Sequence, residues 1–213
     1  MSATTARGLA TRGKTLSRAI AALGAPRGGR TLLSDGDAAL SRALNADLGC
    51  RVLEDVAIES LDAQPSSAFD LVVIANGCEA GGLGQVRQRL ITAKRLLALG
   101  GSLVLYLPTL AAPVSADEAE GPVSPYDLLL FPEAAAAGDL GAALAQRAPL
   151  AASTWLSLFH SLDLGVVAQA GLGAYRFPPE TLNDHQSRLA VFDLLELATG
   201  RLLVILQVRE GAS

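Results

Sequence analysis

The sequence predicts an α/β fold in which a mostly parallel sheet of about seven strands lies between two layers of helices. Short apolar runs alternate with amphipathic stretches along most of the 213 residues. A run over residues 69–75 that is apolar except for Asp70 is typical of a strand covered on both faces. Because alternating strands and helices imply right-handed crossovers and parallel neighbours, the expected architecture is a Rossmann-like three-layer sandwich. A chain of this length is expected to bury one large core.

The first strand and the first helix of this domain enclose an informative turn. Residues 30–34 form a short apolar strand, the turn reads Ser34-Asp35-Gly36-Asp37, and a helix is expected over residues 38–48. Nucleotide-binding α/β folds place a cofactor at such a junction, between the carboxyl end of a strand and a helix N-terminus. Glycine is normally needed where the backbone curls tightly and approaches the ligand. This turn has one glycine, and two carboxylates flank it.

The later elements are predicted from apolar periodicity, with glycine and proline marking the boundaries. A loop that begins at Asn76 follows the strand at 69–75, and the clearest helix, over 85–99, is expected to end at Gly100-Gly101. The remaining elements are expected to be strands over 50–56, 102–107, 165–170 and 202–208, and helical segments over 154–162 and 188–198. The run at 202–208 is too apolar for a surface tail, so it is expected to be a core strand.

Residues 1–29 are predicted to form a basic helical extension, and residues 30–213 the domain itself. The first 34 residues carry six basic residues and no acid, and Leu16, Ile20 and Leu23 share a helical face. This composition resembles a mitochondrial or plastid transit segment. The alternative is a helix that caps the domain.

An irregular insertion or lid is expected at about residues 110–150, which hold five of the ten prolines. Four large apolar residues, including Leu129 and Phe131, stand in a row between Pro125 and Pro132. Exposed apolar clusters tend to mark partner sites, so this row predicts association with a protein partner or a second copy. The alternative is that the row folds over the domain's own cleft.

Composition and charge limit the other kinds of ligand and partner that are expected. A net charge of −4 gives no general reason to expect nucleic acid. Cys50 and Cys78 lack metal-ligand spacing and the chain has only two histidines, so no metal site is predicted, and the cysteines indicate a reduced, intracellular and cytoplasmic protein. The longest uncharged run, residues 96–116, contains a glycine pair and two prolines and therefore favours a core strand over a membrane span.

From Thr31 to Val208 the order of elements resembles the class I S-adenosylmethionine-dependent methyltransferases. The best local matches are residues 69–76 and residues 95–108, where a helix ends in two glycines before a strand and Leu99 replaces the family's proline. The last third is similar to small-molecule members such as quinone-type O-methyltransferases. The resemblance implies an antiparallel C-terminal strand and, for an active member, S-adenosylmethionine as cofactor and a small-molecule substrate.

The cofactor motif departs from the family pattern. The family carries an acid at the end of the first strand and then glycine-x-glycine-x-glycine, and the matching positions hold Leu32 for the acid and Ser34, Gly36 and Ala38 for the glycines. The resemblance also places Glu54 or Asp55 where an acid would hold the cofactor's ribose. The candidate cofactor-binding residues are Ser34, Asp35, Gly36, Asp37, Glu54, Asp55 and Asn76.

The favoured function is a methyltransferase-like protein that has lost S-adenosylmethionine binding and serves as a structural or regulatory subunit, with no cofactor. The alternatives are an active methyltransferase acting on a small molecule, such as a quinone-type hydroxyl, and a degenerate dinucleotide fold used as an interaction module. No catalytic residue is predicted, although Asn76 and Glu79 lie on the loop that would face a reacting methyl group. A nicotinamide-dependent short-chain reductase is excluded, because no tyrosine is followed four residues later by the lysine that this chemistry requires.

Overall fold

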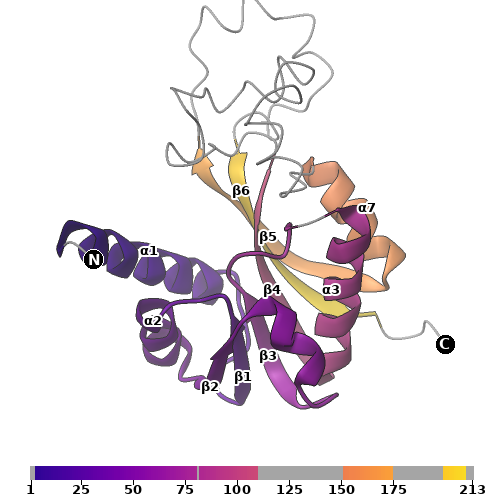
Figure 1. The fold of residues 1–213 in the computed structure, drawn as a ribbon, viewed down its shortest axis with the longest axis horizontal. Helices are drawn as coiled ribbons and strands as arrows, with labels where there is room; N and C mark the ends of the chain where they lie inside the picture. Colours follow the sequence, from indigo (N-terminus) through magenta and orange to yellow (C-terminus); the bar gives the residue numbers. More distant parts are fainter. Residues whose placement is uncertain (1–2, 81, 110–150, 175–198, 210–213) are drawn as a thin grey trace, which may run out of the picture.

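A six-stranded sheet forms the centre of the computed structural model, which describes residues 3–80, 82–109, 151–174 and 199–209 (Figure 1). The strands are β1 (Arg30–Ser34), β2 (Arg51–Val56), β3 (Phe69–Ile74), β4 (Leu97–Pro108), β5 (Leu164–Ala174) and β6 (Thr199–Val208). Their order is β2-β1-β3-β4-β6-β5, and β6 is antiparallel to both of its neighbours, whereas the other pairs are parallel. The predicted mostly parallel sheet with an antiparallel C-terminal strand is confirmed.

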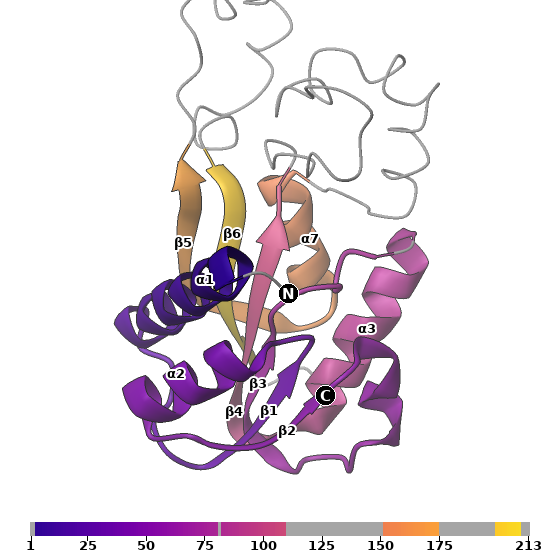
Figure 2. The ribbon, with the colours of Figure 1, turned by 60° about the vertical axis from the view of Figure 1, so that its left-hand side comes forward.

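Helices cover both faces of the sheet (Figures 1 and 2). On one face lie α1 (Ala3–Ala22) and α2 (Ala38–Leu48), and on the other lie the 3-10 helix η1 (Ile58–Ala63), α3 (Leu83–Leu96) and α7 (Ala152–Ser161). Side chains alternate along the strands, so Leu32 is buried beneath the η1, α3 and α7 layer, while Leu33 is buried beneath α1 and α2. The predicted three-layer sandwich is therefore confirmed.

The basic N-terminal segment forms α1, which packs against α2. Leu16 and Ile20 are buried between these helices and the sheet, as their shared helical face predicts. The Ser17 hydroxyl donates a 2.7 Å hydrogen bond to Asp47 Oδ2 of α2. The described part of α1 thus packs on the domain, and targeting by this segment stays a prediction.

The glycine pair after α3 has a different role from the one predicted. The helix ends at Leu96, not at residue 99, and β4 begins at Leu97. Leu97 pairs with Phe69 in the sheet and is buried, so extended pairing replaces the last helical turn. Gly100, at φ +74°, lies where the register with β3 shifts, and a Cβ on Gly101 would be 2.9 Å from the Phe69 carbonyl oxygen.

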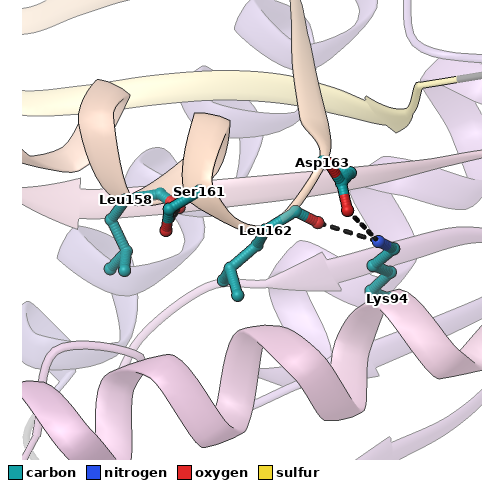
Figure 3. A network of polar contacts seen from close by, with 5 residues as sticks. All are labelled: Lys94, Leu158, Ser161, Leu162 and Asp163. Carbon is teal, nitrogen blue, oxygen red and sulfur yellow. Dashed lines mark hydrogen bonds and ion pairs between the residues drawn. The ribbon is translucent and has the colours of Figure 1, made fainter. Parts of the chain in front are cut away.

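The turn between α7 and β5 is held by α3 (Figure 3). Lys94 Nζ donates a 2.8 Å hydrogen bond to the Leu162 carbonyl oxygen and lies 3.5 Å from Asp163 Oδ2. This lysine therefore connects α3 to a turn that lies 68 residues later in the sequence. β5 is longer than predicted, since it begins at Leu164 and runs to Ala174.

Two regions of the predicted chain lie outside the described residues: the insertion at 110–150, with Leu129 and Phe131, and the helical segment at 188–198. Among the described helices, none is both long enough and apolar enough to span a membrane.

Candidate functional site

The order of the strands reverses direction at β1. The chain passes from β1 to β2 on one side and then returns to place β3 on the other side of β1. In open α/β sheets, ligands bind outside the carboxyl ends of the strands at such a switch point. Three segments meet there: the turn between β1 and α2, the end of β2, and the loop after β3.

Asp35 joins these three segments. Its backbone N–H donates to the Val56 carbonyl oxygen at 3.0 Å, and its carboxylate accepts a hydrogen bond from the Ile58 N–H at 3.2 Å. Its carbonyl oxygen accepts a 2.8 Å hydrogen bond from Asn76 Nδ2. Asp35 adopts φ +48°, a left-handed conformation that aspartate tolerates better than most residues other than glycine. The turn is therefore closed by contacts within the protein.

The two residues that follow Asp35 also form hydrogen bonds within the protein. The Gly36 N–H donates a 3.1 Å hydrogen bond to Asp55 Oδ1. Asp37 is the N-cap of α2 and accepts a 2.6 Å hydrogen bond from the Leu40 N–H. A Cβ on Gly36 would lie 2.4 Å from the Leu33 side chain, so packing against Leu33 is enough to explain this glycine.

Negative charge gathers at this edge of the sheet. Burial raises the pKa of the Asp35 carboxyl above its ordinary value, and the carboxylates of Glu59 and Asp55 raise it further. The hydrogen bond from Ile58 and the positive charge of Arg89 act in the opposite direction. On balance the pKa of Asp35 is raised, chiefly by burial and to a smaller extent by the two neighbouring carboxylates.

Replacing Asp35 by asparagine is expected to stabilise the protein at neutral pH. A carboxyl whose pKa is higher in the folded state stabilises that state fully only below its unfolded pKa, and this contribution is lost as the pH rises through the folded pKa. The gain of D35N should therefore be largest near pH 7 and shrink towards pH 4. It should stay below about 1 kcal/mol, because Asp35 is only partly buried and solvent screens its charge.

Urea unfolding of both proteins at several pH values between 4 and 8 measures this effect. E59Q is the matched control: it removes one of the charges that raise the pKa of Asp35, so D35N should gain less in that background. An equal gain at pH 4 and pH 7 would show that the charge of Asp35 is not its cause.

Arg89 of α3 organises the loop after β3. One guanidinium nitrogen lies 3.1 Å from the Gly77 carbonyl oxygen and also reaches the carbonyls of Cys78 and Ala80. Arg89 is thus held in the loop by several contacts with backbone carbonyls.

The thiol of Cys78, in the same loop, is unreactive at neutral pH. Burial, followed by the charge of Glu79, raises its pKa to about 12.

Two buried polar atoms near the carboxyl ends of β1 and β3 lack partners among the described residues: Ser34 Oγ and Glu79 Oε2. Ser34 is fully buried at the end of β1, and Glu79 is 8% exposed in the loop after β3. Buried polar groups are rarely left without a hydrogen bond. These atoms are therefore the ones in the described part of the chain that a small ligand near the switch point would best satisfy.

The structure brings together most of the predicted site residues. The three segments at the switch point contain six of the predicted residues: Ser34, Asp35, Gly36, Asp37, Asp55 and Asn76. Glu54 lies in β2, paired with Leu32, but its side chain is not among those described. Glu59 and Arg89 were not predicted, because both act through tertiary contacts. The only indication in the sequence for Arg89 was its position off the apolar stripe of α3.

A cavity of about 190 Å³ lies beside the switch point, between η1 and α3. Its lining includes Ile58, Glu59, Asp62, Gln85 and Arg89, so it is mixed in polarity. Within the described residues no group of three or more histidine, cysteine, aspartate or glutamate side chains could hold a metal ion.

Several solved structures similar to this chain are methyltransferases. One is a putative methyltransferase from Bacillus halodurans C-125, with 13% identity over 90% of this chain and 95% of that one and a TM-score of 0.51. Another is an S-adenosylmethionine-dependent methyltransferase from Archaeoglobus fulgidus, with 13% identity over 92% of both chains and the same TM-score. A third, the CurJ carbon methyltransferase, is longer: this chain spans 54% of it, with 15% identity and a TM-score of 0.46.

No model of a protein family matches the sequence, and no curated protein does. Likeness at such low identities establishes the fold alone. The chain has the class I methyltransferase fold that the order of its elements predicts.

Proposed function

We propose that this chain is a methyltransferase-fold protein that no longer binds S-adenosylmethionine with useful affinity and that serves as a structural or regulatory subunit. The observation that carries the proposal is the state of the turn between β1 and α2. Three of its polar groups are used within the protein. The Asp35 carboxylate accepts from the Ile58 N–H, the Gly36 N–H donates to Asp55, and the Asp37 carboxylate accepts from the Leu40 N–H of its own helix. Asp35, Gly36, Asp37 and Asp55 therefore do not fit the cofactor, because these residues, which were expected to hold it, already stabilise the fold.

Asp55 shows this conflict most directly. The resemblance gives it, or Glu54, the task of accepting hydrogen bonds from the ribose hydroxyls of the cofactor. In the structure one oxygen of Asp55 instead accepts the Gly36 N–H, which is a donor that a ligand in this turn would need. Binding in the family's manner would have to break this contact or use only the second oxygen.

Electrostatics act in the same direction. Asp35, Asp37, Asp55 and Glu59 place four carboxylates around a turn that should receive the methionine carboxylate. A like charge at contact distance costs about 1 kcal/mol or more when it is partly buried. Together with the missing glycines, this repulsion is expected to weaken binding by about 100-fold or more, at about 1.4 kcal/mol per decade.

Titration of S-adenosylmethionine into the purified protein by calorimetry tests the proposal. We expect a dissociation constant in the millimolar range or weaker, because the Asp35 and Gly36 N–H groups are already bonded within the protein and the charge of the turn opposes the ligand. S-adenosylhomocysteine is the matched control ligand, since it lacks the sulfonium charge but keeps the carboxylate. A micromolar constant for either ligand would overturn the loss of cofactor binding.

The alternative is an active methyltransferase acting on a small molecule. The unpartnered Ser34 Oγ and Glu79 Oε2 favour it, because a ligand at the switch point could satisfy both. If calorimetry shows tight binding, E54A and D55A separate the two ribose candidates. The variant that removes the ribose partner should then lose about 1–3 kcal/mol of binding free energy.

A further inference from the structure

A second concave surface lies on the opposite face of the sheet, between α1 and α2. This groove has a volume of about 530 Å³. Lys14 and Arg18, one turn apart on α1, form one wall, and Arg42 and Asp47 of α2 form the other. Its floor consists of the alanines of α2 at positions 39, 43 and 46, whose short side chains leave the space open.

The walls of the groove are held in place by two contacts between the helices. At Gly13, α1 approaches the start of α2 so closely that a Cβ would lie 2.9 Å from the Leu40 nitrogen. One turn later, Ser17 Oγ donates to Asp47 Oδ2 at 2.7 Å. The groove therefore exists before any ligand arrives, which lowers the entropy cost of binding.

The charge of the groove is opposite to that of the whole molecule. Three cations, Lys14, Arg18 and Arg42, face one carboxylate, Asp47, on a chain whose net charge is −4. Arg42 Nε donates to the Ala38 carbonyl oxygen at 3.0 Å, which fixes the stem of this side chain and leaves its two terminal nitrogens as donors. Lys14 and Arg18 are exposed, and the Asp47 charge is shared with the Ser17 hydroxyl.

We propose that this groove binds an acidic, amphipathic peptide segment of a partner protein. Small apolar side chains of the peptide would lie on the alanine floor, and its carboxylates would pair with the cations on both walls, as in other complexes of a helix in a groove. Single-stranded nucleic acid fits less well, because none of the described residues that line the groove is aromatic and could stack on a base. The inference rests on the proposed subunit role for its purpose and deepens it by giving the partner's chemistry.

Fluorescence polarisation with a labelled helical peptide tests this proposal. The probe carries glutamates four residues apart around a leucine and an alanine, and the control peptide carries lysine in place of each glutamate. We expect micromolar binding of the acidic peptide that weakens as salt rises, and no binding of the basic one. A labelled ten-residue polyuridylate is the competing probe, and tighter binding of this RNA than of the acidic peptide would overturn the proposal.

Two variants locate the binding site. K14E/R18E reverses two charges of the groove and should weaken binding of the acidic peptide at least tenfold. R27E/R87E makes the same change in net charge at exposed positions elsewhere and should change this binding less than twofold. A46W fills the floor without changing charge and should also weaken binding. Equal losses from both charge reversals, or no binding to the original protein at millimolar peptide, would contradict the assignment.

The outcome is separable from that of the cofactor titration. K14E/R18E should leave the calorimetric result with S-adenosylmethionine unchanged, because the groove lies across the sheet from the cavity between η1 and α3. Tight cofactor binding together with peptide binding would overturn the proposed function and leave the groove assignment standing. Weak cofactor binding without peptide binding would do the reverse.

Discussion

Removing residues 200–213 is expected to abolish cooperative unfolding of the protein. β6 lies between β4 and β5 and pairs along both, so its loss opens the sheet and leaves β5 without its partner. Five consecutive residues of β6, 202–206, are buried large aliphatics. At about 1.5–3 kcal/mol each, their burial contributes on the order of 10 kcal/mol, which matches the whole net stability of a typical domain.

Circular dichroism during heating measures this loss. The truncated chain should lack a sharp transition, while removal of residues 210–213 alone, beyond the end of β6, should leave the melting temperature nearly unchanged. A chain ending at residue 199 that melts cooperatively near the full-length temperature would show that β6 is peripheral to stability.

The strands at the centre of the sheet could be predicted because burial on both faces leaves a clear mark in sequence. Residues 71–74 and 202–206 are continuous apolar runs, and each lies in a strand as expected. The antiparallel direction of β6 could be inferred only from the family resemblance, because an apolar run carries no direction. The predicted end of α3 was wrong, because pairing of Leu97 with Phe69 is a tertiary contact that helical periodicity cannot reveal.

The candidate site was predictable in position but not in detail. Asp35, Gly36 and Asp37 were recognised because a turn after an apolar strand is a local pattern. Their hydrogen bonds to Ile58, to Asp55 and within α2 depend on the three-dimensional fold, and so does the raised pKa of Asp35. The groove between α1 and α2 was not predicted, because its walls come from two helices whose packing the sequence does not specify.

Trp155 holds α7 onto the sheet, and it is the largest fully buried side chain among the described residues. Its ring stacks on Phe159 one turn later, with 6.0 Å between ring centroids. Its Nε1–H lies 3.4 Å from the Pro108 carbonyl oxygen at the end of β4. Trp155 therefore combines apolar burial with a polar contact that connects α7 to a central strand.

Replacing Trp155 by alanine should lower the free energy of unfolding by about 3–5 kcal/mol, because the substitution leaves a large cavity and removes the donor to Pro108. W155F should cost less, since phenylalanine keeps an aromatic ring against Phe159 but still leaves the Pro108 carbonyl without this donor. L99A is the matched control: Leu99 is 97% exposed, so its truncation should change stability by less than about 0.5 kcal/mol. Urea unfolding followed by circular dichroism compares the three variants on one scale. If W155A loses no more than L99A, α7 does not depend on this side chain, and the packing described for that face of the sheet does not stabilise the fold.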